Sequence, residues 1–299
     1  MPLKWDDLKV FLAVARLDSL SNAGRALKLD PATVGRRIAR LEEHLDVRLF
    51  VKSPQGYALT EAGQGLVDHA SAAERAVIAA QEENRGQAEG LSGSIRIGAP
   101  DGVANYLLPQ ITADICEDNP GLEVQIVALP RVFNLSKREA DMAITVSPPQ
   151  TGRLTVQRLT DYHLHLAATA DYLAAHPAIK QREDLRHHRL IGYIPDMIFD
   201  PELDYMDVLG EGARAHLTSN SFSVQLNWAR RGAGICIMHD FAIPTFPELR
   251  KILTEQVSLK RSFYLIRHAD DRRVDRLNRF TDQLAEKLRR EVARLEANS

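Results

Sequence analysis

The stretch Leu29–Leu45, LDPATVGRRIARLEEHL, combines a strong helical period with three arginines. Its apolar residues recur at intervals of four, three and four, which places them on one face of an α-helix. Asp30 can cap the free N–H groups of such a helix, and Pro31 suits a first turn that needs no backbone donor. The stretch therefore predicts an amphipathic helix whose leading half is basic. The apolar face consists of Val34, Ile38, Leu41 and Leu45, and the arginines away from it are Arg36, Arg37 and Arg40.

Two shorter helices are predicted before this one, and a hairpin after it. The stretch SLSNAGRALKL, residues 19–29, predicts the second helix with Ser21 as its cap. The link of residues 28–30 is too short for anything but a tight corner, which describes a helix-turn-helix. The stretch VRLFVKSPQGYALT, residues 47–60, predicts two strands joined by a type I turn at residues 53–56. Residues 1–60 are therefore predicted to form a winged helix-turn-helix. The apolar face of its first helix consists of Leu8, Phe11, Leu12 and Ala15.

The basic residues of the chain gather in this segment. The whole chain of 299 residues has a formal net charge of −2, whereas Arg16 to Lys52 contains eight basic and five acidic residues. Any contact with nucleic acid must therefore come from a local patch. In a winged helix-turn-helix the third helix enters the major groove with its N-terminal half nearest the bases, although a merely solvated basic face is the alternative. The predicted DNA-binding residues are Ser21, Asn22, Pro31, Ala32, Thr33, Arg36, Arg37, Arg40 and Lys52.

Roles within this set follow from position. We expect Arg36 or Arg37 to contact a base, with no preference between the two, and Arg40 to contact a phosphate. Lys52 in the wing and Thr33 near the start of the helix are expected to contact the DNA backbone.

Residues 61–89 predict one long helix, which ends near a glycine-rich hinge at residues 86–94, GQAEGLSGS. Its small and apolar residues form a narrow seam at spacings of seven, four, three, four and three. Such a seam favours pairing with the same helix of a second copy, although it could also pack against its own chain. The seam consists of Leu59, Leu66, Ala70, Ala73, Val77 and Ala80.

Residues 90–299 predict an α/β domain, because short apolar runs alternate with helical segments. The runs SIRIGA, LEVQIV and DMAITV form a first block of strands, with a helical segment at residues 103–117. A second block contains YHLHLAATA, RLIGY, AHLTS, GICIMHD and SFYLIR, with a helix at residues 222–231. A long C-terminal helix is predicted to pack on this domain through its apolar stripe. That stripe consists of Val274, Leu277, Phe280, Leu284, Leu288, Val292 and Leu295.

Several other signals bound the function. Cys116 and Cys236 lie in apolar patterns, which indicates buried thiols in a reducing compartment and no disulfide. The charged N-terminus is unlike a secretory signal and no run reaches the ~20 apolar residues of a membrane span, so we expect a cytoplasmic protein without a membrane partner. His163 and His165 share a strand face, but no third ligand is visible, so neither a metal site nor a cofactor is predicted. The sequence contains neither a Gly-rich phosphate-binding loop nor a G-x-S-x-G motif, so no motif indicates an enzyme.

Seven motifs resemble landmarks of the LysR-type transcriptional regulators, and they span essentially the whole chain: DLKVFLAVARLDSLSNAGRAL, TVGRRIARLEEHLDVRLF, LTEAG, SGSIRIGAP, READMAI, AATADYLAAHP and GAGICIMHD. The resemblance implies a DNA-binding homo-oligomer, typically a dimer of dimers and therefore a homotetramer. It also implies a periplasmic-binding-protein-like effector domain at residues 90–299. Its lobe I would comprise about 90–161 and 267–299, and its lobe II about 162–266, with a small-molecule cleft between them. A solute-binding protein or a small-molecule enzyme built on the same lobes is the alternative.

The recognition helix departs from the family pattern at two places. Asp30 and Pro31 replace a common Ser-Gln pair, and the loss of a Gln that could bind adenine shifts base reading toward arginines, which pair most often with guanine. Gly35 replaces a common serine, although glycine costs about 1 kcal/mol relative to alanine within a helix. Either Gly35 permits a close approach to the DNA backbone, or it is a tolerated change.

The resemblance places effector contacts at the corners GAPDGVAN, residues 98–105, and LTSNSFSV, residues 217–224. Helix N-termini at such corners can seat a carboxylate. However, Asp101 adds a negative charge, and Thr145 replaces an arginine that many relatives carry. We therefore expect a neutral or amine-bearing effector, or a degenerate cleft, unless Asp101 is no more than a helix cap. The predicted effector-binding residues are Pro100, Asp101, Gly102, Thr145, Ser147, Ser219, Asn220 and Ser221.

Overall fold

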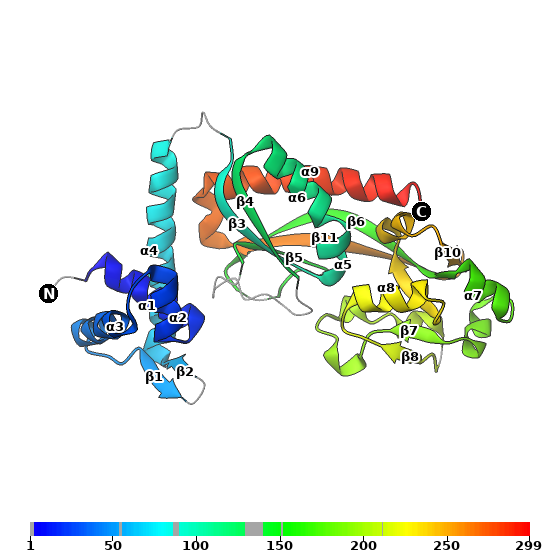
Figure 1. Cartoon of the computed structure of the whole chain (residues 1–299), viewed down its shortest axis with the longest axis horizontal. Coiled ribbons are helices and arrows are strands. Elements are labelled where there is room, and N and C mark those ends of the chain that lie inside the picture. The colour runs from blue at the N-terminus through cyan, green and yellow to red at the C-terminus, as the bar shows by residue number, and fades with distance from the viewer. Residues whose placement is uncertain (1–2, 54–55, 86–89, 129–139, 151, 211) are drawn as a thin grey trace. The chain divides into compact units, whose positions relative to one another are not determined.

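The computed structural model describes residues 3–53, 56–85, 90–128, 140–150, 152–210 and 212–299. The chain divides into two compact units, each of which is described by itself (Figure 1). The first unit consists of Met1–Ala88 with the short pieces Ser136–Glu139 and Asp270–Asp275. The second unit consists of Glu89–Leu135, Ala140–Ala269 and Arg276–Ser299.

The first unit is a winged helix-turn-helix followed by a long helix, as predicted. Strands β1 and β2 pair antiparallel, and Tyr57 N–H donates to the Asp18 carbonyl oxygen at 2.9 Å, which fastens the wing to the end of the first helix. Gly56 has a φ of 129°, and a Cβ there would lie 2.2 Å from that same oxygen, so only glycine fits. The predicted type I turn falls on residues 54–55, outside the described residues. The elements are α1 (Trp5–Leu17), α2 (Leu20–Leu27), α3 (Pro31–Leu45), β1 (Phe50–Ser53), β2 (Gly56–Leu59) and α4 (Glu61–Arg85).

The start of α3 is confirmed, whereas the predicted cap of α2 is wrong. Asp30 precedes α3 and accepts a hydrogen bond from Thr33 N–H at 2.8 Å, with Pro31 as the first helical residue. For α2 the cap is Ser19, whose hydroxyl accepts from Asn22 N–H at 3.3 Å. Ser21 lies inside the helix and is exposed. A capping side chain must stand just before the first helical residue, and α2 begins earlier than a cap at Ser21 would require.

The core of the first unit forms where the apolar faces of its helices meet the wing. The predicted faces of α1 and α3 are buried, except that Leu45 is only half-buried. The Phe11 and Phe50 rings lie 5.4 Å apart and join α1 to β1. This packing fixes α3 against α1 by its apolar side, so its opposite side remains exposed.

Helix α4 uses part of its predicted seam within the chain. Of the seam residues, Ala70 is buried in the core of the first unit and Leu66 packs against that core, beside the buried Val67. Glu74 pairs with Arg16 of α1 at 2.7 Å. Farther along the seam Val77 is 38% exposed. The stretch at Ala70 therefore packs against its own chain. Pairing of the exposed stretch at Val77 with a second copy stays a prediction. The predicted hinge includes residues 86–89, which lie outside the described residues.

The second unit contains one mixed sheet, which confirms the α/β prediction (Figure 1). Among the described residues its strand order is β4-β3-β5-β11-β6-β9-β7-β8, with β10 paired to β6. The strands β3, β4 and β5 run parallel to one another, as do β7, β8 and β9. The antiparallel pair β6 and β11 lies between these two groups, with a register shift between Phe263 and Tyr264. The strands are β3 (Ser92–Ala99), β4 (Gly121–Ala128), β5 (Met142–Thr145), β6 (Leu154–Thr169), β7 (Leu190–Gly192), β8 (Ala215–Thr218), β9 (Ile235–His239), β10 (Leu249–Ile252) and β11 (Ser258–His268).

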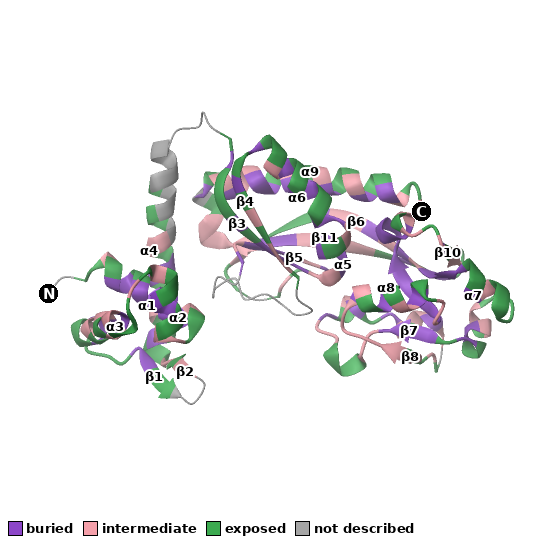
Figure 2. Ribbon diagram, in the orientation of Figure 1, coloured by how far each residue is buried: buried purple, intermediate pink, exposed green. Residues whose placement is uncertain are grey.

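Helices connect the strands within both groups. The predicted helical segment at residues 103–117 is two helices, α5 (Asp101–Tyr106) and α6 (Leu108–Asp118). The predicted helix at residues 222–231 is α8 (Phe222–Arg230), whereas α7 (Ala170–Ala175) and strand β10 were not predicted. The C-terminal helix α9 (Asp275–Glu296) buries all members of the predicted stripe that it contains, and Val274 just before it is buried too, so the predicted packing role is confirmed (Figure 2).

Both cysteines are free thiols. Cys236 is buried, as predicted, and burial raises the pKa of its thiol to about 12. Cys116, in the last turn of α6, is only half-buried, so the prediction that both thiols are buried is wrong for Cys116. Over the described parts of the chain, none of the helices combines the length and the apolar character that crossing a bilayer requires.

Candidate functional site

A chain of hydrogen bonds organises the leading end of α3. The Thr33 hydroxyl donates to Asp30 at 2.5 Å, and Arg36 Nη2 donates to the same hydroxyl at 2.7 Å. The two hydrogen bonds from Thr33 lower the pKa of the Asp30 carboxyl, which therefore stays charged. The guanidinium of Arg36 is thus held against Thr33 in the first turn of α3, while Arg36 remains exposed.

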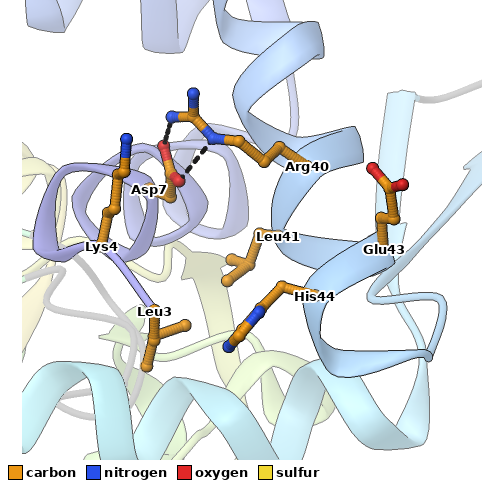
Figure 3. A pocket seen from close by; sticks show the side chains of 7 residues that line it. All are labelled: Leu3, Lys4, Asp7, Arg40, Leu41, Glu43 and His44. Atoms are coloured by element: carbon orange, nitrogen blue, oxygen red, sulfur yellow. Dashed lines mark hydrogen bonds and ion pairs between the residues drawn. The ribbon is translucent and has the colours of Figure 1, made fainter. Parts of the chain in front are cut away.

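The other two arginines of α3 are paired with carboxylates of α1. Arg40 Nε donates to Asp7 Oδ2 at 2.8 Å, and its Nη2 donates to Asp7 Oδ1 (Figure 3). This bidentate hydrogen bonding raises the pKa of Arg40. Arg37 Nη1 lies 3.8 Å from Asp6 Oδ2, and its side chain is 28% exposed. Two of the three arginines are therefore neutralised by the first turn of α1.

The fully exposed face of α3 contains one arginine. Ala32, Arg36, Ala39 and Glu43 are exposed at intervals of four, three and four. The two alanines leave the Arg36 side chain without bulky neighbours on this face. Small side chains allow a helix to approach the floor of a groove, and an alanine methyl can contact the thymine methyl group.

The remaining predicted DNA-binding residues are also on the surface. Ser21 and Asn22 are exposed in the first turn of α2, and Pro31 is exposed at the start of α3. Lys52 is exposed on β1, opposite Tyr57 of β2. Thr33 is half-buried, and its hydroxyl is already used by Asp30 and Arg36.

A cavity of about 380 Å³ lies between the start of α1 and the second half of α3 (Figure 3). The Arg40 and Asp7 pair forms one side of it. Leu3, Leu41 and His44 form the other side. Sequence reasoning did not identify this cavity, because the segments that line it, residues 3–7 and 40–44, are more than 30 residues apart along the chain.

In the second unit, the two predicted effector corners come together through Asp101. Asp101 is the first residue of α5, and its Oδ2 accepts from Ser223 N–H at 2.7 Å and from the Ser221 hydroxyl at 3.0 Å. These donors belong to the N-terminus of α8, which Ser221 caps by accepting from Val224 N–H at 3.3 Å. The carboxylate therefore occupies the place at which a ligand carboxylate was expected.

The space left beside Asp101 is small. A cavity of about 20 Å³ remains, and none of the described residues that line it is a lysine or an arginine. Its lining includes the predicted residues Pro100, Asp101, Gly102 and Asn220. It also includes residues that were not predicted: Val103, Val146, Tyr193, Phe199, Leu203, His239 and Phe263.

His239 is the chemically notable member of this lining. It is 5% exposed, its Nδ1 is buried without a hydrogen-bond partner, and burial lowers the pKa of its imidazole to about 3. It is the penultimate residue of GICIMHD, which the sequence marked as a strand and as part of a family landmark but not as part of a site. A Cβ on Gly102 would lie 2.8 Å from His239 Cε1, so the backbone at Gly102 rests on the imidazole edge.

The other predicted effector residues lie near this cavity but are not part of its described lining. Ser147 donates its hydroxyl hydrogen bond to Asp200, and Thr145 donates to the Ser147 carbonyl oxygen at 2.7 Å. Ser219 accepts from Ser221 N–H at 3.1 Å. These side chains bond to their own chain, and Asp200 is a partner that the sequence did not reveal.

The histidine pair on β6 is used structurally. His163 Nδ1 lies 2.8 Å from Glu296 Oε2, and His165 Nδ1 lies 2.9 Å from both carboxylate oxygens of Asp240. Across the described ranges, no cluster of three or more His, Cys, Asp or Glu residues has a geometry that could hold a metal ion.

Comparison with known proteins covers both units. Residues 5–64 match the model described as bacterial regulatory helix-turn-helix protein, lysR family. Residues 88–289 match the model described as LysR substrate binding domain. The second match alone spans more than half of the chain.

Individual relatives and solved structures agree with these matches. The chain is 26% identical to the HTH-type transcriptional regulator CrgA of Neisseria meningitidis over 289 residues, which is 95% of this chain and 96% of CrgA. It is 28% identical to the HTH-type transcriptional activator TtdR of Escherichia coli, with 83% of this chain and 81% of TtdR covered. The CrgA structure superposes with a TM-score of 0.60 and covers 96% of this chain and 99% of that one. A full-length OxyR variant from Pseudomonas aeruginosa has a TM-score of 0.73 at 18% identity, covering 96% and 98%.

Proposed function

The chain belongs to the LysR family of bacterial transcriptional regulators, and we propose that it reads its operator chiefly through Arg36. Members of the family bind DNA, form oligomers and bind small-molecule effectors. They are regulators, so an enzyme and a solute-binding transport protein are set aside as explanations of the α/β lobes. We propose in addition which residue contacts the bases, which surface forms the oligomer and what chemical class of effector binds.

The exposed position of Arg36 is the observation that supports its proposed contact with DNA bases. Arg36 is the arginine of α3 that lies on the fully exposed face, between two alanines, with its guanidinium steadied by Thr33. Guanine O6 and N7 are the commonest partners of such a side chain. Arg37 pairs with Asp6 and Arg40 pairs with Asp7, which partly offsets the positive charge of both arginines. In this proposal the two arginines contact DNA phosphates and not bases. The sequence left Arg36 and Arg37 equal, and the ion pair of Arg37 is the reason for preferring Arg36.

Pairing through α4 is the second part of the proposal. Val77 is exposed on the seam beyond the part that packs on α1. A second copy covering this stretch would place two α3 helices on one duplex, as half-sites about one helical turn apart require. We infer a dimer of dimers that acts in the cytoplasm, where the chromosome lies.

The effector is proposed to enter the space around Pro100, Gly102 and Asn220. The lining described there is apolar and aromatic, with Asp101 as its charged member and His239 neutral. A carboxylate ligand would meet the charge of Asp101 without a compensating cation. This supports a neutral or amine-bearing effector.

Binding to DNA from upstream of the protein's own gene tests the proposal. Fluorescence anisotropy would compare that duplex with a shuffled one, for wild type, Arg36→Ala and Arg290→Ala. Arg290 is an exposed arginine of α9, so it controls for the loss of one charge. Arg36→Ala should weaken specific binding by roughly 10- to 100-fold, equivalent to about 1–3 kcal/mol, and shuffled DNA far less.

A second variant separates base reading from phosphate binding. Lys52→Ala should weaken both duplexes alike and reduce the slope of log affinity against log salt by about one. Equal losses on specific and shuffled DNA for Arg36→Ala would contradict the role given to Arg36.

A further inference from the structure

The carboxylate of Asp101 joins two segments that lie 120 residues apart. Asp101 follows β3, whereas its partners are Ser221, which immediately precedes α8, and Ser223, the second residue of α8. Its other oxygen accepts from Asn105 Nδ2 at 2.8 Å. The first N–H groups of a helix have no partner within it and carry partial positive charge, so an anion is stabilised there. The carboxylate of Asp101 is therefore the anion that is bound at the N-terminus of α8.

Asp101 is not acting as the cap of its own helix. It is the first residue of α5, and the residue in the capping position, Pro100, makes no side-chain capping bond. The carboxylate instead accepts from the first turn of α8, beside Ser221, the N-cap residue of that helix. These bonds connect the segment that follows β3 with the helix between β8 and β9, and the two strands belong to the groups β3-β4-β5 and β7-β8-β9.

Other contacts across the same space show how tightly it is closed. Ser147, just beyond β5, donates to Asp200. The Tyr106 ring of α5 meets Phe222 of α8 edge-on, with 5.7 Å between centroids. The backbone at Gly102 rests on His239 of β9, where no Cβ could fit. The cavity beside Asp101 measures about 20 Å³, room for about one water molecule, whereas ligand sites usually measure about 300–1,000 Å³.

We propose that Asp101 is a built-in substitute for an effector carboxylate, which holds the two lobes closed without a ligand. The proposal rests on the role proposed above for the space between the lobes. It adds a specificity rule: carboxylate effectors are excluded because their seat on α8 is already filled. An effector of this protein must then either displace Asp101 or bind beside it through a cationic or neutral group.

Removing the carboxylate should create a site that a small free carboxylate can fill. Thermal unfolding of the full chain would be followed with sodium acetate or sodium formate, against equal sodium chloride and against acetamide. Asp101→Ala should melt below wild type and should recover by about 2–4 °C in a saturable manner with acetate, but not with chloride or acetamide. Wild type should respond to acetate no more than to chloride.

Two further variants keep the test decisive. Asp114→Ala removes an exposed carboxylate from α6 in the same lobe and should show no acetate-specific rise. Asp101→Ser leaves a shorter side chain at the same place, so it should recover with formate if Asp101→Ala does not fold. Absence of a carboxylate-specific rise in both Asp101 variants overturns the proposal.

The outcome is independent of DNA binding. If Asp101→Ala takes up acetate but no ligand changes operator binding, the substitute carboxylate stands and the effector role fails. If acetate has no effect while Arg36→Ala loses specific binding, the proposed DNA recognition is supported and the proposed role of Asp101 as a substitute carboxylate is contradicted.

Discussion

Asp7 of α1 holds Arg40 of α3 by both of its carboxylate oxygens. The Asp7 side chain is 5% exposed and that of Arg40 is 42% exposed, so the pair lies at the edge of the core. The carboxylate cannot easily be hydrated, whereas the guanidinium still reaches solvent. This pair orients the recognition helix on α1, and Arg40 therefore has a structural role besides any contact with phosphate.

Arg40→Ala should destabilise the first unit, because it leaves the buried Asp7 carboxylate without its partner. We expect the free energy of unfolding to fall by more than loss of an exposed ion pair would cause, but by less than the full cost of breaking a buried pair, because Arg40 is partly exposed. Urea unfolding in a Trp228→Phe background would measure it, since Trp5 then reports on the first unit. Arg36→Ala, which breaks no buried pair, should change the free energy of unfolding by less than about 0.5 kcal/mol. Equal losses for both variants would contradict the structural role of Arg40.

Gly35→Ala decides between the two explanations of that glycine. A Cβ at Gly35 would lie 3.6 Å from Leu20 Cδ1, an ordinary contact. The alanine should therefore stabilise α3 by about 0.5–1 kcal/mol in the same unfolding assay. If Gly35 is a tolerated change, operator affinity stays within about twofold of wild type. A large loss of affinity in a stabilised variant would instead favour a close approach of the DNA backbone.

Val77→Asp tests pairing through α4. A charge placed in an apolar contact between two helices loses its hydration without gaining a partner, so the dimer should weaken by about tenfold or more. Light scattering after size-exclusion chromatography over a range of concentrations measures the change. Val156→Asp serves as the control, because Val156 is 44% exposed on β6. A dimer that is unaffected by Val77→Asp would assign pairing to another surface.

His239 makes stability depend on pH. Its folded pKa of about 3 lies below the ordinary value of 6.5 because burial disfavours the charged imidazole. The unfolded state therefore binds more protons, and this contribution to stability is complete above about pH 6.5 and is lost as the pH falls toward 3. Between pH 7 and 5.5 the loss should be about 1 kcal/mol. His239→Gln should remove it from the urea-unfolding profile, whereas the exposed His187→Gln should not.

The sequence predicted those features that depend on neighbours along the chain. The period of residues 29–45 predicted α3 and its buried side, and Asp30 and Pro31 marked its start, because caps and amphipathic faces are local properties. The alternation of apolar runs predicted the α/β sheet in the same way. The wrong prediction of Ser21 as the cap of α2 also has a local cause. Ser19 and Ser21 are two residues apart, and the residue at which α2 begins determines which of them is the cap.

Contacts between distant segments could not be predicted. Nothing in the composition links Asp6 and Asp7 to the arginines of α3, yet these carboxylates distinguish Arg36 from Arg37 and Arg40. Similarly, Asp101 was recognised as an unwelcome charge for an anionic ligand, but its seat on α8 depends on packing 120 residues away. Which stretch of the α4 seam packs on α1 was likewise settled by tertiary structure.

The ribbon of β6 and β11 limits how the second unit can respond to anything that binds it. The polypeptide passes from one group of strands to the other along β6 and returns along its neighbour β11, and the two are hydrogen-bonded over most of their length. A paired ribbon resists stretching and shear but can bend where its ladder is interrupted, at the register shift beside Phe263. Any signal within this unit should consequently travel as a pivot about that bulge, with small displacements near it and the largest ones at the outermost strands, β4 and β8.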